Sequence, residues 1–453
     1  MRTVVLTQLA GAYDNEFWMV DAVRAAETYP AVWFAGVALT EMYQSIAHAK
    51  MSRSQQLSRR IRAMENYGRA VRSILDVTGQ ASVTLADKKA VILSSLLLIG
   101  FCNLENNVLK LTAHVRNAFQ ILNQWQLGGS LEQSSESGSI INTSSLIRQL
   151  QRFEVECAIL NIPHAFLNEG IRAVPASSSF TSASAAYTEF LSISPPCMAA
   201  IMDAAKAALS EKPIPESVLS CRRLFKQWKA KFVTLLQARD HDSSDECLLS
   251  LRIWSITIEI GLFVERSGLL WKELAYDAWN PLFEKQLDLA EQLRAAITKN
   301  VTGQGGQRSR RLLQPFSFSK TIADALVLVH RCRVGSVRRR AIALLRNWPH
   351  QQGLGSNYLV ADIMEAKTQV EEEAFLLPGA ARPAGCQCVA PHYICPLHRC
   401  IKQQVRQPEQ LRSENMVSSQ TVVRLFLPAD LRGPQNLVER TLTLNRHYVE
   451  DWL

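Results

Sequence analysis

Six side chains of the types that bind soft metal ions lie close together near the C-terminal end of the sequence. Zinc is held by thiolates and imidazoles in tetrahedral sites, commonly through pairs of cysteines two residues apart. Here the cysteines follow the pattern C-x-C-x6-C-x4-C, which is not one of those spacings, and no Lys/Arg-rich background surrounds them. The spacing favours unconnected loop cysteines, with zinc binding and local disulfide or redox chemistry as alternatives. The six residues are Cys386, Cys388, His392, Cys395, His398 and Cys400.

A short acidic stretch is the second group that could do chemistry. Asp240, Asp242, Asp245 and Glu246 could bind a divalent ion, and in a helical protein this would suggest prenyl-diphosphate chemistry. The stretch stands just before an expected helix, where carboxylates accept hydrogen bonds from free amides and interact favourably with the helix dipole. No second acidic motif accompanies it. We therefore expect a helix start, with Ser243 and Glu246 as a capping box.

Basic residues form three local groups. One group alternates with Leu224, Phe225 and Trp228, which is typical of a basic solvated face over a packed apolar face, with partner binding as the alternative. The other two are short arginine clusters that could serve nuclear import. The first group is Arg222, Arg223, Lys226, Lys229 and Lys231; the import candidates are Arg308, Arg310 and Arg311, and Arg338, Arg339 and Arg340.

No motif for phosphate binding or nucleophilic catalysis is present. The sequence contains neither G-x-x-x-x-G-K-[ST] nor G-x-G-x-x-G, and it lacks G-x-S-x-G. Histidines such as His48, His114, His164 and His330 occur singly within helical patterns, where a core or surface role is the usual one. No nucleophile, base and orienting group come together. We predict that the chain is not an enzyme, and we expect no cofactor apart from the zinc alternative at 386–400.

The elements that must position these side chains are predicted to be helices. Apolar residues recur at intervals of three and four through most of the sequence, and alternating strand patterns are scarce. We predict an all-α fold, a large multi-helix domain with a less regular C-terminal tail and one strand at 421–427. Expected helices begin near Pro30 and then cover 56–75, 87–104, 107–127, 145–167, 184–210, 215–238, 245–272, 283–299, 318–331, 336–347 and 356–375.

Composition bounds the domain organisation. Of 453 residues, 47% are hydrophobic, which is enough for a large core, and the net charge of +9 is mild for a chain of this length. The longest apolar run, 90–102, is too short to span a bilayer, so we expect no membrane association. Most of the ten cysteines stand alone, which favours a reducing compartment. The predicted parts are 1–127, a flexible linker at 128–145, helical 146–376, and the tail 377–453.

Four ordered segments resemble the regulatory domain of fungal zinc binuclear cluster transcription factors. The first is Pro30-Ala31-Val32 leading to residues 38–43, and the second is 65–72 around Tyr67. The third is the apolar helix 96–105, followed by Asn107 and the histidine-led helix at 114–118. The fourth combines 338–345, Gln352-Gly353-Leu354 and 371–373. Together these segments span residues 15 to 375.

The resemblance implies a transcription regulator located in the nucleus, with a cytoplasmic location as the alternative. The family reads DNA through an N-terminal six-cysteine cluster that begins C-x2-C-x6-C, whereas the first cysteine here is Cys102. We therefore expect action through partners of the transcription machinery or a DNA-binding partner, without direct DNA binding, and a homodimer stays open. A secondary-metabolite pathway is a plausible target for this family. The first alternative is a helical adaptor or scaffold unrelated to transcription, and the second is an all-helical enzyme.

Overall fold

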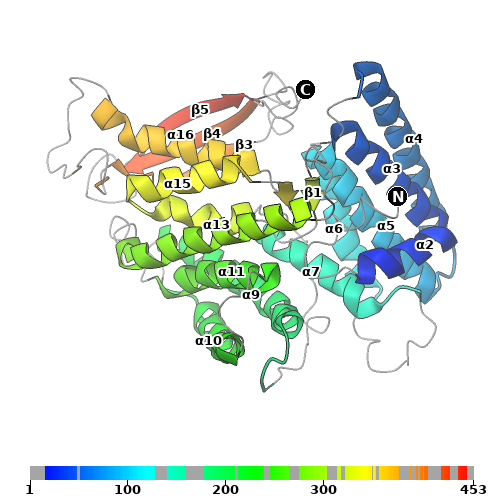
Figure 1. Ribbon diagram of the computed structural model, residues 1–453, viewed down its shortest axis with the longest axis horizontal. Coiled ribbons are helices and arrows are strands. Elements are labelled where there is room, and N and C mark those ends of the chain that lie inside the picture. The colour runs from blue at the N-terminus through cyan, green and yellow to red at the C-terminus, as the bar shows by residue number, and fades with distance from the viewer. Residues whose placement is uncertain are drawn as a thin grey trace.

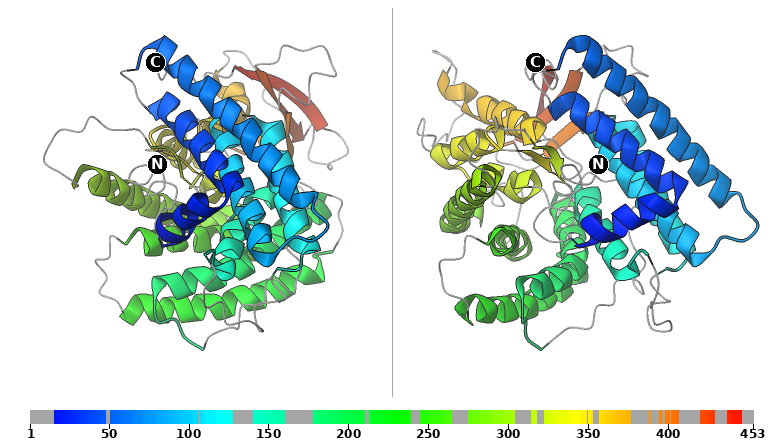
Figure 2. Two further views of the ribbon diagram at one scale, coloured as in Figure 1. Left: turned by 90° about the vertical axis from the view of Figure 1, so that its right-hand side faces the viewer. Right: turned by 45° about the vertical axis from the view of Figure 1, so that its right-hand side comes forward.

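The chain folds mainly into helices, as the sequence predicts. The computed structural model describes residues 16–47, 51–105, 107–127, 140–159, 178–209, 213–238, 245–264, 275–303, 314–317, 322–348, 350–352, 357–376, 388, 394–395, 398–400, 402–406, 420–428 and 437–445. Helices from the two halves of the chain gather on opposite sides of the molecule (Figure 1; Figure 2). The fold is therefore predominantly all-α, with small sheets added to it.

The first core is made of buried apolar residues between Phe17 and Cys157. Its central helix, α5, is buried on nearly every side from Lys89 to Asn103, as expected for a helix that is apolar all round. Helix α3 packs on α5, and the longer α4, which packs mainly on α3, starts at a capping box formed by Ser52 and Gln55. The elements are η1 (Phe17–Asp21), α2 (Ala22–Thr28), α3 (Pro30–Ala47), α4 (Arg53–Thr78), α5 (Leu85–Leu104), α6 (Val108–Gln124) and α7 (Thr143–Ile159).

The second core joins buried apolar residues between Phe180 and Met364. Here α11 is the central, almost fully buried helix, and α9, α10 and α13 pack around it. Trp228 of α10 lies among several aromatic rings and donates a 3.0 Å hydrogen bond to the Ala186 carbonyl. The elements are α9 (Ala183–Leu209), α10 (Glu216–Ala238), α11 (Glu246–Phe263), η2 (Tyr276–Trp279), α13 (Asn280–Gly303), α14 (Ile322–Leu326), η3 (Val327–Arg331), α15 (Gly335–Arg346) and α16 (Asn357–Leu376).

The two cores meet through α7 and α9. The Arg152 guanidinium of α7 lies 5.4 Å from the ring centroid of Tyr187 in α9. A second link is β1 (Gln314–Ser317), which pairs in parallel with β2 (His350–Gln352) and also contacts α3 and α5. The two halves are thus joined both along the chain and by a segment that returns to the first half.

The predicted division of the chain is corrected by the cores. Residues 140–159 were assigned partly to a linker and partly to the second helical part, but Ile141, Leu150 and Phe153 are buried in the first core. Helix α7 starts at Thr143, inside the expected linker 128–145. The change of core falls between Cys157 and Phe180 instead.

The C-terminal tail is more regular than predicted. Beside the expected strand, observed as β4 (Gln420–Pro428), it contains β3 (Lys402–Arg406) and β5 (Leu437–Asn445). They form an antiparallel sheet in the order β3-β4-β5. Val423 and Leu425 of β4 pack with Cys400 against Ile363 and Val370 of α16, which places the sheet on that helix (Figure 1). Among the described residues, no helix is both long and apolar enough to cross a membrane.

Candidate functional site

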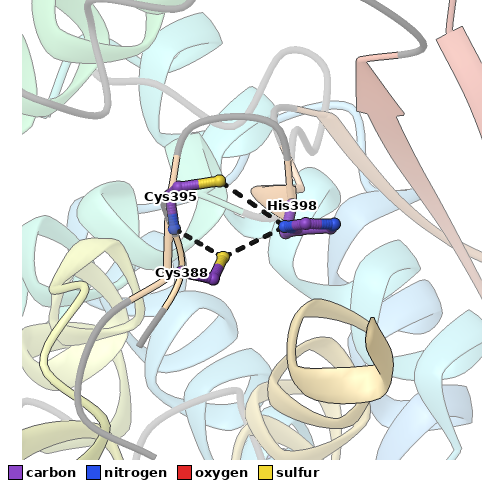
Figure 3. A group of neighbouring side chains, drawn as sticks. All are labelled: Cys388, Cys395 and His398. Atoms are coloured by element: carbon purple, nitrogen blue, oxygen red, sulfur yellow. Dashed lines mark hydrogen bonds between the residues drawn. The ribbon is translucent and has the colours of Figure 1, made fainter. Parts of the chain in front are cut away.

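Three of the six predicted soft ligands come together in the structure. The Cys388 Sγ lies 3.0 Å from the His398 Nδ1, and the Cys395 Sγ lies 3.5 Å from the same nitrogen (Figure 3). One ligand atom from each residue falls within 4.8 Å of the other two. We call Cys388, Cys395 and His398 the Cys-Cys-His group. The favoured interpretation, unconnected loop cysteines, does not describe these three residues.

The backbone around the Cys-Cys-His group holds the side chains on one side of a turn. The His398 N–H donates a 3.1 Å hydrogen bond to the Cys395 carbonyl, and this turn directs both side chains to the same place. The Cys395 N–H donates to the Cys388 sulfur at 3.0 Å (Figure 3). All three residues are buried, with exposed fractions of 7%, 1% and 8% in chain order. The turn and the amide hydrogen bond therefore hold the three donor atoms together in a buried position.

Buried arginines fix this segment to the helices of the second half. Arg399, which is fully buried, donates to Glu371 of α16 at 2.7 Å and to the His330 and Arg331 carbonyls at 3.1 and 3.2 Å. The Cys400 N–H donates to the second Glu371 oxygen at 2.9 Å. Arg399, which follows His398 in the sequence, is therefore held both by α16 and by the backbone at the end of η3.

The other end of the segment is held by Arg333, between η3 and α15. Its Nη1 donates to the Ile394 carbonyl at 3.3 Å, while its Nε donates to Asp277 at 2.9 Å. Arg338 of α15 completes the cluster with a 2.5 Å ion pair to Glu371 and a 3.1 Å pair to Glu372. Burial holds the pKa of the Arg338 guanidinium below its usual value, although Glu371 opposes that shift. Lys367 of α16 pairs with the other Glu371 oxygen at 3.6 Å, and we call Arg338, Lys367, Glu371 and Arg399 the buried ion cluster.

Of the other three predicted ligands, the structure describes only Cys400. The Cys400 side chain belongs to the apolar cluster with Val423 and Leu425, so it faces the sheet. Cys386 and His392 lie outside the described residues. Sequence reasoning missed the supporting residues Glu371, Arg399 and Arg333. Two features of the sequence could have indicated them: Arg399 directly follows the candidate ligand His398, and Glu371 begins an acidic run near the end of an expected helix.

The acidic stretch acts as a helix cap where it is described. Asp245 is the N-cap of α11, and its carboxylate accepts hydrogen bonds from the Cys247 and Leu248 amides at 2.8 and 3.3 Å. The expected start with Ser243 as the cap is corrected, because the helix begins one residue after Asp245. Asp240, Asp242 and Ser243 lie outside the described residues.

The arginine triplet proposed for nuclear import serves as a set of internal ion pairs. Arg338 is buried against Glu371, Arg339 pairs with Glu372 at 3.2 Å, and Arg340 pairs with Asp288 and Glu291. These contacts leave Arg338 inaccessible to an import receptor in the folded chain. The other import candidates, Arg308, Arg310 and Arg311, lie outside the described residues.

The basic side chains of α10 also contact their own chain. Lys231 pairs with Glu189 of α9, Lys229 pairs with Glu259 of α11, and the Arg222 Nε donates to the Leu262 carbonyl at 2.7 Å. Val218, Phe225 and Trp228 of the same helix are buried. The interpretation of α10 as a basic face over a packed apolar face is therefore the one that fits these contacts.

A second polar group lies in the first core, beside a hollow lined by Val71, His114 and Trp125. The Tyr67 hydroxyl and the His114 Nε2 are 2.9 Å apart, and the Tyr67 ring stacks on Phe101. Burial, and secondarily Lys110, lower the pKa of His114 from 6.5 to about 4. Burial likewise raises the pKa of Tyr67 to about 12. Both side chains are therefore neutral at pH 7.

We expect His114 to make the folded state less stable in acid. The unfolded chain takes up a proton near pH 6.5, whereas the folded chain does so only near pH 4. The free energy of unfolding should therefore fall between those values, by about 1–3 kcal/mol for this half-buried group. Urea unfolding of the protein and of His114→Gln from pH 8 to pH 4 measures this. The stability advantage of histidine over glutamine should shrink as the pH falls; an advantage independent of pH would contradict the assignment.

Compared with protein-family models, with curated proteins and with solved structures, the chain shows no match. Any statement about its function therefore depends on its own residues and contacts.

Proposed function

We propose that the chain is a regulator of transcription of the fungal zinc-cluster type, which acts through a helical regulatory domain and reaches promoters through a partner. The observation that carries the proposal is that the segments resembling this family contact one another. Tyr67 comes from the second such segment, Phe101 and His114 come from the third, and the three side chains meet in the first core. Arg338 and Glu371 come from two parts of the late segment and form the centre of the buried ion cluster.

These contacts support the resemblance because residues far apart in the sequence share one structural task. Tyr67 and His114 are 47 positions apart, and Arg338 and Glu371 are 33 positions apart. Both pairs join different helices, so each is a tertiary contact between residues of the resembling segments. Two helical cores joined at α7 and α9 form a scaffold whose conformational population a bound partner could shift, which suits a regulatory domain.

The described residues around the Cys-Cys-His group assign it no DNA-reading role. DNA recognition by small zinc modules needs basic side chains around the metal to contact phosphates. In this segment Arg399 is buried and engaged with Glu371. The proposal is therefore a regulator that depends on a DNA-binding partner. A nuclear location belongs to the proposal, whereas a helical adaptor in the cytoplasm is the alternative.

The test is a reporter assay with the full chain fused to an unrelated DNA-binding domain, in a fungal host. We expect the fusion to change reporter transcription relative to the DNA-binding domain alone, and a fluorescently tagged full chain to accumulate in the nucleus. A fusion carrying Trp228→Ala, which disrupts the second core, should lose the effect. A folded fusion that leaves the reporter unchanged, together with a cytoplasmic tagged chain, would favour the adaptor.

A further inference from the structure

We propose that Cys388, Cys395 and His398 bind one zinc ion, which fixes the segment 388–400 between the second core and the C-terminal sheet. The proposal starts from their convergence. In a tetrahedral zinc site with thiolate and imidazole ligands, sulfur and nitrogen atoms bound to the same ion lie about 3.6 Å apart. The two sulfur–nitrogen distances here are 3.0 and 3.5 Å. The three donor atoms already surround one point.

The donor set selects the kind of ion. Two thiolates and one imidazole are ligands for zinc and other soft or borderline cations, whereas calcium and magnesium require oxygen donors. The Glu371 carboxylate of α16, which contacts this segment, uses both oxygens to accept from Arg338, Arg399 and the Cys400 amide. It is therefore committed to the buried ion cluster. A divalent ion with two thiolates is neutral overall, which suits a buried position beside several arginines.

The surroundings of the group resemble a supported metal site rather than a chance contact. The Cys395 amide already donates to the Cys388 sulfur, as amides do for metal-bound thiolates. Arg399 and Arg333 hold the backbone on either side of the group through the His330, Arg331 and Ile394 carbonyls. Ligands fixed in this way lose little further freedom when the ion binds. The fourth coordination position belongs to a donor outside the group.

The position of the group indicates a structural role for the ion. Strand β3 starts at Lys402, two residues after Cys400, and Cys400 packs on Val423 and Leu425. Three apolar residues make only a small core, and small units of this kind commonly depend on a metal. The zinc ion would thus fix the turn that leads into the sheet. This role is independent of the proposed transcriptional function and can be tested without it.

Metal content of the full chain is the first measurement. The protein is purified under reducing conditions without chelator, and zinc is measured by elemental analysis and native mass spectrometry. We expect one zinc per chain. Exchange with Co²⁺ should give visible bands of tetrahedral cobalt and a near-ultraviolet band of thiolate-to-cobalt charge transfer. Folded, fully reduced protein without stoichiometric zinc, which also fails to take up Co²⁺, would overturn the proposal and leave a metal-free thiol–imidazole pair.

Variants identify the ligands. Cys388→Ser, Cys395→Ser and His398→Gln should each lose the ion and the cobalt bands. Cys400→Ser is the matched control, because this buried thiol lies in the same segment but faces the sheet, and it should retain the ion. Loss of the ion from Cys400→Ser with the fold intact, or retention by Cys388→Ser combined with Cys395→Ser, would contradict the assigned ligands.

If a variant fails to fold, a measurement on the unchanged protein tests the same ligands. Alkylation of thiols, located by mass spectrometry, should spare Cys388 and Cys395 until a chelator is added. Cys102, in the first core, should be equally protected before and after chelation. Rapid alkylation of Cys388 and Cys395 without chelator would exclude a bound ion.

Discussion

Replacing Glu371 by glutamine is expected to lower the free energy of unfolding by about 3–5 kcal/mol, because a buried ion pair that loses one partner leaves its opposite charge uncompensated. Glutamine keeps the shape of the side chain but removes the charge that faces Arg338 and Arg399. Both arginines would remain buried beside each other with like charges. Urea unfolding followed by circular dichroism measures the loss.

The matched control lies on the same helix. Glu365 pairs with Arg346 in a half-exposed position, so Glu365→Gln should cost about 0–1 kcal/mol. Glu371→Gln should also release the Cys400 backbone, which hydrogen exchange would detect as faster exchange in 398–406. Equal losses for the two variants would mean that the buried ion cluster contributes no more than a surface pair.

Trp228→Ala is the second substitution with a large expected effect, a loss of about 3–5 kcal/mol from an emptied aromatic site. The indole is fully buried, and the rings of Phe190 and Phe232 lie 4.9 and 4.7 Å from it. The substitution also removes the hydrogen bond to the Ala186 carbonyl. Hydrogen exchange should show lost protection in α9, α10 and α11, with α5 of the first core less affected.

Two controls separate the contributions at this site. Trp228→Phe keeps an aromatic ring but cannot donate to Ala186, so it should cost about 1–3 kcal/mol. Leu224→Ala removes a largely exposed side chain of the same helix and should change stability by about 0.5 kcal/mol or less. Equal loss of protection in both cores for Trp228→Ala would show that the cores unfold as one unit.

The helices could be predicted from the sequence because their signal is local. The apolar spacing at 87–104 and 336–347 depends on neighbouring residues only, and the observed helices Leu85–Leu104 and Gly335–Arg346 differ by one or two residues. The sheet was largely missed, since β3 is short and polar and obtains its stability by pairing with β4. Such pairing over a distance leaves little trace in a local pattern. The end of the first core was missed for a similar reason. A Ser- and Gly-rich run resembled a domain boundary, although α7, which follows it, packs against the earlier helices of the first core.

The candidate site was only partly predictable. The ligand types at 388, 395 and 398 were visible, but their spacing did not match the usual zinc patterns, because the turn at Cys395 and His398 supplies the geometry instead. The residues that hold the segment around Cys395 and His398 come from α15, α16 and the connection between η3 and α15, which are far from it in the sequence. Arg333, Arg338 and Glu371 carry no signal of joint action until the fold brings them together. The import interpretation of Arg338 was unsupported for that reason, since an exposed and a buried arginine look alike in a sequence.

The order of the two cores along the chain has a consequence for synthesis on the ribosome. Every member of the first core precedes Phe180, which is the first member of the second core in the sequence. At a synthesis rate of about 5–20 residues per second, the last residue of the first core is made roughly 10–40 seconds before the last residue of the second core. Glu371 meets Arg338 first, and Arg399 joins them afterwards. We therefore expect the nascent chain to fold in stages, with the segment that carries Cys395, His398 and Arg399 docking onto helices that have already formed.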